Sequence, residues 1–272
     1  MTPPRDRPAK PHGFKPHGFR PRAPQRPGPS AREGNDHVVL YGWHPVSQAL
    51  ANAGRRFHRL LATENALVRL KETLDALPIE PEIVRPSDID KLLGPDAVHQ
   101  GLYAEAEPLA APTLDAMPDD ALLLALDQLT DPHNVGAIVR TAAAFGVTAI
   151  VTTARHSPNA TGVLAKSASG GLEHVPLVIV RNLAEALITL GERGFTRIGL
   201  DSEAGTSLDA VGPRRPAVLV LGAEGKGLRQ RTTECCDVLV RIDAVGAIRS
   251  LNVSNAAAIT LYALTRSAKG AD

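Results

Sequence analysis

The chain has 272 residues, of which 43% are hydrophobic and 3% aromatic, and its formal net charge is +1. The length allows one large domain or two smaller ones, and so few aromatic residues argue against a broad base-stacking surface as the main contact with nucleic acid. No apolar run approaches the roughly 20 residues of a membrane span, and the first residues lack the apolar segment of a secretory signal. Two adjacent cysteines, Cys235 and Cys236, cannot form an ordinary disulfide framework, so we expect a cytoplasmic protein without a metal site.

The first residues differ in composition from the rest of the chain. Residues 1–35 hold eight Lys or Arg, two acidic side chains and nine prolines, which leaves 22 basic and 27 acidic side chains in the remainder. With few apolar groups to offset the entropy of ordering, the segment 1–36 is predicted to be a disordered basic tail. Its charge would attract phosphate backbones without sequence preference; a purely solubilising extension is the open alternative.

Between residues 37 and 107, short apolar runs alternate with helical patterns. The predicted strands lie at 38–42, 57–63, 81–86 and 101–109, and the predicted helices at 44–53, 64–77 and 87–93. This alternation indicates a small α/β domain. Prolines at positions 108, 112 and 118 then break the periodicity, which predicts a linker over 108–120.

From residue 121 to residue 272, continuous apolar runs take over. They are predicted to be strands buried on both faces, at 121–129, 148–153, 175–180, 196–202, 217–222 and 238–243. Helical patterns fill most of the intervals. This order is typical of an α/β fold with a parallel, doubly wound sheet, whose ligands bind beyond the carboxyl ends of the strands. The usual rules for connections favour an open, unknotted topology.

The first loop after such a strand is "DQLTDPHNVGAIVRTAAAFG". Asn134 is placed to cap a helix that begins near Val135. Gly136 and Arg140 are four residues apart and share a face of that helix. Because helical side chains lean toward the N-terminus, Arg140 is expected to point over a surface that Gly136 leaves bare, toward the strand end. A structural ion pair of Arg140 with a carboxylate is the alternative.

The second loop is "LVLGAEGKGLRQ", in which glycines at 222, 225 and 227 surround Glu224 and Lys226. The spacing fits neither a Walker loop nor the G-x-G-x-x-G fingerprint of dinucleotide sites. The glycines still predict unusual backbone dihedrals or a closely approaching ligand. Glu224 would then be held rigidly at the mouth of the sheet, although a simple surface turn would also accommodate it.

The third site is "SLNVSNAAAITLY", at the entrance to the last helix. Four small polar residues stand there: Ser250, Asn252, Ser254 and Asn255. Either of the last two can cap the helix, which leaves Ser250 and Asn252 without a structural duty. Alternation along an extended segment puts these two on one side, facing a cavity, while Leu251 and Val253 anchor the loop from the other. The alternative is a polar turn with redundant caps.

The three loops together carry a family resemblance. "NVGAIVR", "LGAEGKGLR" and "SLNVSNAAAITLY", in this order and at strand ends, resemble the three motifs of the SpoU or TrmH family of RNA ribose 2′-O-methyltransferases. The segment "KSASGGLEHVPL" (166–177) extends the likeness. "YGWHPVSQAL" and "VHQGLYAEAEPL" resemble the substrate-binding domain found before the catalytic one in members that act on large-subunit ribosomal RNA. The resemblance covers roughly residues 37 to 266.

This resemblance implies a fold and a site. The C-terminal chain is expected to thread through a loop and form a deep trefoil knot that binds S-adenosylmethionine, against the unknotted expectation. The partners implied are RNA, most of all a guanosine of 23S rRNA or its large-subunit precursor, and a second copy of the chain in a homodimer. By motif position, the active site comprises Asn134, Arg140, Glu224, Ser250 and Asn252. The cofactor is held by backbone at Gly222, Ile242 and Leu251.

The role expected for Arg140 follows from the chemistry of methylating a ribose hydroxyl. The hydroxyl must lose a proton while it attacks the methyl carbon, and holding the two in line supplies much of the rate. The family's proposed activator stands at Arg140, but a guanidinium keeps its proton at neutral pH. We therefore expect Arg140 to bind the neighbouring phosphate and stabilise the developing alkoxide, with Glu224 orienting Arg140 or the loop. A role of Arg140 as the base is the alternative.

Three residues at the edge of the cofactor loop depart from the family pattern. Asp243 and Ala244 stand where Pro and Met are common, and Asn255 stands where Val is usual.

The added N-terminal domain favours ribosomal RNA as the substrate, because transfer RNA methyltransferases of this family often use short extensions. A transfer RNA guanosine methyltransferase, an rRNA-modifying resistance methyltransferase and a catalytically inactive ribosome-assembly protein are the alternatives.

Overall fold

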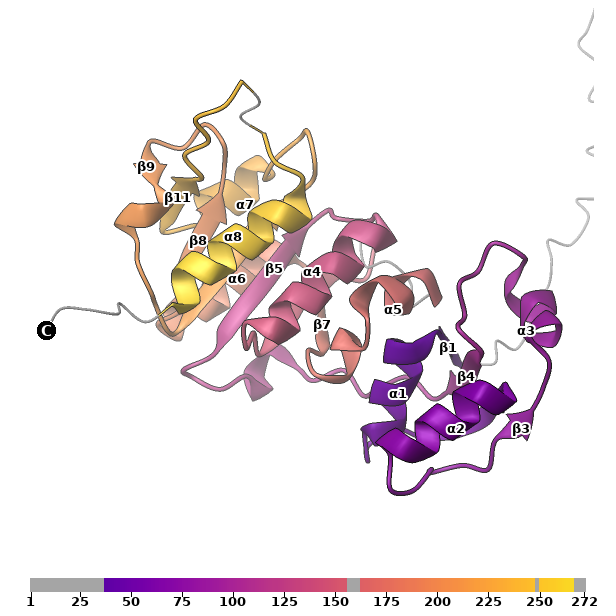
Figure 1. Ribbon diagram of the computed structural model, residues 1–272. Coiled ribbons are helices and arrows are strands. Elements are labelled where there is room, and N and C mark those ends of the chain that lie inside the picture. Colours follow the sequence, from indigo (N-terminus) through magenta and orange to yellow (C-terminus); the bar gives the residue numbers. More distant parts are fainter. Residues whose placement is uncertain (1–36, 156–161, 248–249, 267–272) are drawn as a thin grey trace, which may run out of the picture. The chain divides into compact units, whose positions relative to one another are not determined.

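The computed structural model describes residues 37–155, 162–247 and 250–266 (Figure 1). The basic tail predicted for 1–36 lies outside these residues. Two β-sheets organise the described chain. We call the part built on the first sheet, residues 38–106, the small subdomain, and the part built on the second, residues 122–265, the large subdomain. In the described ranges, no helix is long and apolar enough to cross a membrane.

The small subdomain consists of a four-stranded sheet and three helices. Its strands run in the order β1-β4-β2-β3; β4 is antiparallel to both neighbours, and β2 and β3 are parallel. The elements are β1 (Val38–Tyr41), α1 (Trp43–Ala51), β2 (Phe57–Ala62), α2 (Glu64–Thr73), β3 (Glu82–Ile83), α3 (Pro86–Leu93) and β4 (Leu102–Ala106). Each element predicted for this region is present. The hydroxyl of Thr63 caps α2 by accepting a hydrogen bond from the N–H of Ala66.

The large subdomain contains a seven-stranded sheet in which all strands are parallel. Their order is β7-β6-β5-β10-β8-β11-β9. The strands are β5 (Leu122–Asp127), β6 (Ala149–Thr153), β7 (Leu177–Val180), β8 (Thr196–Leu200), β9 (Thr206–Ser207), β10 (Ala217–Gly222) and β11 (Val238–Arg241). Six of them match predicted strands, whereas the two-residue β9 is too short to show a periodicity.

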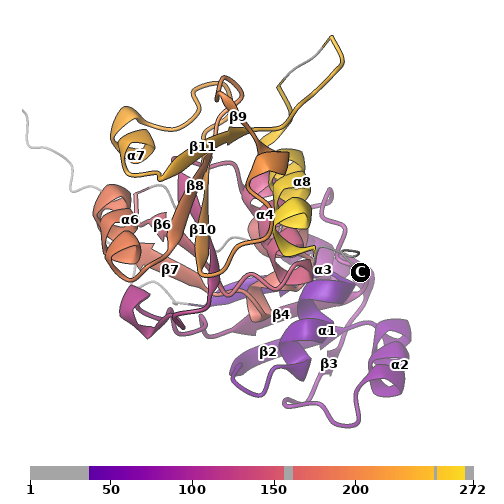
Figure 2. The same cartoon turned by 90° about the vertical axis from the view of Figure 1, so that its left-hand side faces the viewer.

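Helices cover both faces of this sheet. They are α4 (Pro132–Ala144), α5 (Gly162–Ala168), α6 (Leu183–Glu192), α7 (Gln230–Glu234) and α8 (Val253–Thr265), with short 3₁₀ helices η1 (Leu114–Ala116), η2 (Gly171–Glu173) and η3 (Leu208–Ala210). On β5, Leu122, Leu124 and Leu126 belong to the core under α4, α5 and α8, while Leu123 and Ala125 belong to the core under α6. Figure 2 shows α4 and α8 on one side of β8 and β10 and α6 on the other. The predicted parallel α/β fold is thus confirmed.

The helix after β5 begins earlier than predicted. α4 starts at Pro132 rather than near Val135, because the Asp131 carboxylate accepts hydrogen bonds from the backbone N–H groups of His133 and Asn134. The prediction that Asn134 is the cap is therefore wrong. Since Asp131 takes over that duty, the side chain of Asn134 is available for another contact.

The last helix also begins differently from the prediction. α8 starts at Val253, and the side-chain oxygen of Asn252 accepts the capping hydrogen bond from the N–H of Ser254. Neither Ser254 nor Asn255 is the cap, and Asn252 does have a structural duty. An amide side chain offers an acceptor and two donors, so Asn252 can cap the helix through its oxygen and keep its nitrogen for the site.

Gly136 allows α4 and α5 to approach closely. A Cβ built on Gly136 would lie 2.3 Å from the Cβ of Ser167, 2.9 Å from the backbone nitrogen of Ala168 and 3.0 Å from the carbonyl oxygen of Leu164. The expectation that Gly136 leaves a bare surface is therefore wrong, because α5 occupies it. The glycine serves helix packing.

We expect Gly136→Ala to lower the free energy of unfolding by about 2 kcal/mol, because the added methyl group meets backbone atoms of α5 that cannot move independently. The gain in helix propensity, roughly 1 kcal/mol, offsets only part of this cost. Urea unfolding measures the effect. Gly205→Ala is the matched control, since a Cβ there meets nothing within 4 Å; equal stability of the two variants would contradict the packing role of Gly136.

Candidate active site

The carboxyl ends of β5 and β10 bring two motif loops to the same place. In the parallel register Asp127, the last residue of β5, pairs with Gly222, the last residue of β10. The loop after β5 leads to Asn134 and the loop after β10 carries Glu224. The segment before α8 reaches the same edge, because Asn252 contacts Asn134 across 118 residues of sequence. Three separate motifs thus meet at one end of the sheet.

A directed chain of hydrogen bonds joins the three motifs. The Glu224 carboxylate can only accept, so Asn134 presents its Nδ2 to the Oε2 of Glu224, at 3.4 Å. The Oδ1 of Asn134 then accepts from the Nδ2 of Asn252 at 2.9 Å. The Oδ1 of Asn252 accepts from the N–H and the hydroxyl of Ser254, at 2.9 and 2.6 Å. Both amides therefore have a fixed orientation, and Ser254, which was predicted as a possible helix cap, instead donates to the Oδ1 of Asn252 in this chain.

A cavity of about 540 Å³ opens beside the hydrogen-bond chain. Its wall contains six of the eight predicted site residues, namely Gly222, Glu224, Ile242, Ser250, Leu251 and Asn252. Asn134 contacts the wall through Glu224 and Asn252. Among the described residues, no group of three or more His, Cys, Asp or Glu side chains could hold a metal ion.

The loop after β10 folds back onto its own start. A Cβ on Gly222 would lie 2.2 Å from the carbonyl carbon of Gly227 and 2.5 Å from the nitrogen of Leu228. Gly225 and Gly227 have φ angles of 74° and 65°, a region that favours glycine. The predicted unusual dihedrals are therefore confirmed, and the close approach to Gly222 is made by the loop's own backbone. Glu224 is exposed on a loop whose shape its glycines fix.

Asp127 holds the far end of this loop, and sequence reasoning missed it. Its carboxylate is fully buried and accepts hydrogen bonds from the N–H of Arg229 at 2.9 Å and from the Nε of Arg229 at 2.7 Å. A buried carboxylate is stable only when it is paired in this way. The signal in the sequence was an acidic residue that ends the fully apolar run "ALLLALD".

The segment before α8 is anchored less firmly than predicted. Val253 is buried, as expected, but Leu251 keeps 39% of its surface exposed. Asp243, one of the departures from the family pattern, is held by the Ser207 hydroxyl and by the Arg241 guanidinium, whose Nε lies 2.8 Å from the Asp243 Oδ1. These contacts lower the pKa of Asp243 below its ordinary value. The departure thus fastens the end of β11.

A second cavity, of about 300 Å³, adjoins the first, and both walls include Ala223, Glu224 and Val253. Gln128, directly after β5, lines this second cavity together with Lys226. The backbone of Gln128 has a φ of 62°, which costs a residue with a side chain roughly 1–2 kcal/mol. Strain of this kind is concentrated at functional sites.

Arg140 lies apart from both cavities. It follows Asn134 by six positions on α4, which corresponds to about 9 Å along the helix axis. Its side chain is exposed and, within the described part of the chain, forms no hydrogen bond or ion pair. Glu224 bonds to Asn134 and not to Arg140. The structure thus brings seven of the eight predicted site residues together and leaves Arg140 outside.

Two family models match the chain. The model of the SpoU rRNA Methylase family matches residues 121–262, more than half of the chain. The chain belongs to this SpoU family. The membership predicted from the three motifs is thereby confirmed. The second model, described as RNA 2′-O ribose methyltransferase substrate binding, matches residues 39–112, which include the small subdomain except for Val38, the first residue of β1.

Named relatives and solved structures agree with SpoU membership. The 23S rRNA (guanosine-2′-O-)-methyltransferase RlmB of Pseudomonas aeruginosa is 42% identical over 240 residues, 84% of this chain and 95% of that protein. RlmB of Pseudomonas putida is 36% identical over 238 residues, with the same coverage of 84% and 95%. The SpoU methyltransferase AviRb of Streptomyces viridochromogenes, solved with AdoMet, has a TM-score of 0.71 and 25% identity over 84% of this chain and 88% of that one.

We expect Asp127→Asn to loosen the glycine loop of this SpoU protein. The substitution removes the charge that holds Arg229, whose side chain is 43% exposed, so the loss of unfolding free energy is about 2 kcal/mol, below the cost of breaking a fully buried pair. Hydrogen exchange of the amides at 223–229 should become faster than in the parent protein.

Glu234→Gln is the matched control for this prediction. It breaks the Arg231–Glu234 pair, whose side chains are 69% and 48% exposed, and should change stability by less than about 0.5 kcal/mol. If exchange at 223–229 were equally slow in Asp127→Asn and in this control, Asp127 would not hold the loop.

Proposed function

We propose that this SpoU-family protein transfers the methyl group of S-adenosylmethionine to a ribose 2′-hydroxyl of RNA, in a guanosine of 23S rRNA. The meeting of the three motif loops at one cavity, joined through Asn134, Glu224 and Asn252, is the observation that carries this proposal. The RlmB relatives act by name on guanosines of 23S rRNA. The match of the small subdomain to the substrate-binding model supports an RNA substrate.

The larger cavity suits the cofactor. Its volume of about 540 Å³ lies within the usual range of small-molecule sites. Backbone groups at Gly222, Ile242 and Leu251 would hold the polar parts of S-adenosylmethionine, and the side chains of Leu200 and Leu221 supply an apolar wall for its adenine ring. The bound cofactor supplies an electrophilic methyl carbon.

The acceptor nucleotide belongs in the smaller cavity. The two cavities share Glu224, so a ribose in the second would stand beside the methyl donor in the first. Because Asn134 holds the Glu224 carboxylate, the protein's part is to fix the two reactants in line, which removes much of the entropic barrier. Gln128 and Lys226 offer an amide and an ammonium group to the base or its phosphate.

A homodimer would bring Arg140 into the active site. Arg140 is exposed on α4, and α8, which packs against α4, exposes Ile259 and Tyr262 by 42% and 57%. A second copy docked on the α4–α8 face would cover these apolar side chains and enclose the Arg140 region beside the RNA. There the guanidinium would bind a phosphate and stabilise the developing alkoxide, since it keeps its own proton, and the proton of the 2′-hydroxyl would leave to water.

We further propose that the C-terminal chain forms a trefoil knot and that the protein works in the cytoplasm. The cavity wall joins residues at the ends of three strands, Leu200 of β8, Gly222 of β10 and Ile242 after β11, and then continues into the segment before α8. A C-terminal chain threaded through a loop would produce such a convergence. Cys235 and Cys236 are both free thiols, which supports a reducing compartment.

The first test is methyl transfer itself. The purified chain, given S-adenosylmethionine with a labelled methyl group, should label a 23S rRNA transcript at one guanosine, and the 2′-O-methyl group should be missing from rRNA of cells that lack the gene. Label in transfer RNA or at an adenosine would favour the transfer RNA or the resistance alternative. Uptake of the cofactor without any transfer would favour the inactive assembly protein, and no uptake in calorimetry would overturn the whole proposal.

The substitution Arg140→Lys keeps the positive charge of this side chain and removes the planar geometry of the guanidinium. We expect kcat to fall about 100-fold, because an ammonium group cannot reproduce the planar, two-pronged contact with a phosphate. The dissociation constant of S-adenosylmethionine should stay unchanged, since Arg140 lines neither cavity. Near-normal turnover of the variant would show that the guanidinium is not needed.

A further inference from the structure

Two adjacent glycines lie where the small subdomain meets the large one. Gly170 faces α1: its φ is 88°, and a Cβ built on it would lie 2.5 Å from the Cγ of Gln48 and 2.8 Å from the Cβ of Gln48. Gly171 faces α4: a Cβ there would lie 3.1 Å from the carbonyl oxygen of Val139 and 3.2 Å from the Cα of Arg140. One glycine therefore lets the backbone touch the small subdomain, and the next lets it touch the helix that carries Arg140.

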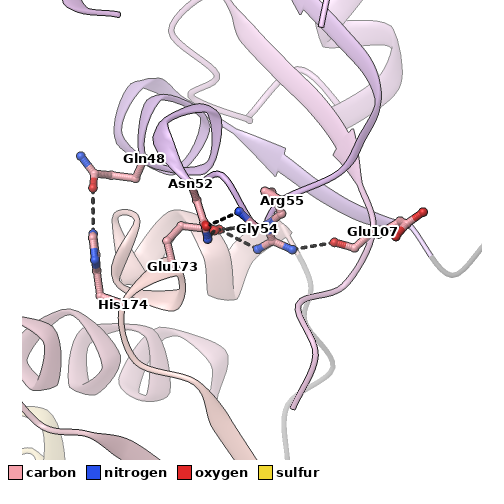
Figure 3. Close-up of polar contacts among 7 residues, drawn as sticks. All are labelled: Gln48, Asn52, Gly54, Arg55, Glu107, Glu173 and His174. Atoms are coloured by element: carbon pink, nitrogen blue, oxygen red, sulfur yellow. Dashed lines mark hydrogen bonds and ion pairs between the residues drawn. The ribbon is translucent and has the colours of Figure 1, made fainter. Parts of the chain in front are cut away.

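Glu173, at the end of η2, forms a buried ion pair with Arg55 of the small subdomain. The Nη2 of Arg55 lies 2.6 Å from the Oε1 of Glu173, and the Nε lies 3.2 Å from both carboxylate oxygens (Figure 3). The side chains are only 4% and 3% exposed. Asn52 donates a further hydrogen bond to the Oε2 of Glu173 at 2.8 Å. The carboxylate is thus fully engaged by two residues that follow α1.

Neighbouring contacts extend this junction. Arg55 also donates from Nη1 to the carbonyl oxygen of Glu107, at 2.7 Å, so one guanidinium ties the chain after β4 to Glu173. The Nε2 of His174 and the Oε1 of Gln48 are 2.8 Å apart. Leu172 packs against the hydrophobic cores of both subdomains. We call residues 170–174 the joint.

We propose that the joint fixes the small subdomain relative to α4, and that Arg55 and Glu173 are positioning residues that present bound RNA to Arg140. This inference rests on the proposed function for the role of Arg140. The arrangement of the small subdomain against α4 does not rest on that role, since it follows from the contacts of the joint and from the packing of Ala165 of α5 in the core of the small subdomain.

The burial of the Arg55–Glu173 ion pair favours a positioning role for the joint. A buried pair contributes little to stability because its desolvation costs about as much as its attraction returns, but it tolerates few geometries. Here the geometry is set from both sides, by Asn52 and by the carbonyl of Glu107. RNA that binds a rigidly held small subdomain meets the reaction centre at a high effective concentration, without a further loss of orientational freedom.

A distance measurement tests the joint without reference to catalysis. Spin labels at Glu72→Cys on α2 and Glu185→Cys on α6 occupy exposed positions on the two subdomains. Native Cys235 is buried, and burial raises the pKa of Cys236 to about 12, so both native thiols label slowly. With the labelled chain diluted in an excess of unlabelled chain, so that any dimer carries labels on one copy only, we expect one narrow distance distribution in the parent chain and a broad one in Glu173→Ala. A narrow distribution in both would overturn the proposal.

Two further variants keep this test decisive. Glu173→Ala leaves a buried guanidinium unpaired and can impair folding, so Arg55→Ala combined with Glu173→Ala removes both charges and should broaden the distribution equally. Glu82→Ala is the matched control: it breaks the Arg59–Glu82 pair, with distances of 2.9 and 3.0 Å, which lies within the small subdomain and is 39% and 54% exposed. The control should behave like the parent chain.

Dependence on RNA length separates positioning from a merely structural effect. On a long structured 23S rRNA fragment that spans both subdomains, kcat/KM of the double variant should fall at least 10-fold, while on a short hairpin that carries only the acceptor loop it should match the parent. An equal loss on both RNAs would overturn the positioning role. If the parent chain transfers no methyl group at all, the proposed function fails, and the distance measurement still decides on the joint.

Discussion

The parallel pairing of β5 with β10 is the contact on which the site depends. Because the register sets Asp127 beside Gly222, the loops that follow the two strands leave the sheet as neighbours. Asp127 then fastens the end of one loop through Arg229, and Asn134, in the first turn of α4, reaches Glu224 in the other. Parallel strands with both faces buried hold this edge rigidly, so the motif residues need few contacts of their own.

Much of this arrangement could be predicted from the sequence, and the missing part has a physical reason. Apolar runs such as 217–222 predict buried strands because each side chain faces a core. The motif resemblance then assigned eight residues, of which all but Arg140 line one of the two adjoining cavities. The cap of α4 was missed because Asp131 and Asn134 are both suitable capping residues, and the structure places Asp131 in that role, directly before Pro132 in the first turn. Nor does any local pattern link Asp127 to Arg229, which lies 102 residues away.

Glycines set the close distances in three different settings. Gly136 brings α5 against α4, Gly171 brings the joint against the backbone of Arg140, and Gly222 lets the following loop fold back on itself. In each case a single Cβ would lie within 3.2 Å of a backbone atom. The helix that bears Asn134 and Arg140, α4, thus packs against α5, the joint and α8.

The strand order also determines how the chain can fold during its own synthesis. β10 lies between β5 and β8, and β11 lies between β8 and β9, although the ribosome completes both outer strands first in each case. The facing edges of β5 and β8 therefore stay unpaired until residue 222 has emerged. Unpaired strand edges recruit strands of other chains. These edges are consequently open to pairing with other chains until late in translation, when β10 leaves the exit tunnel and completes the centre of the sheet.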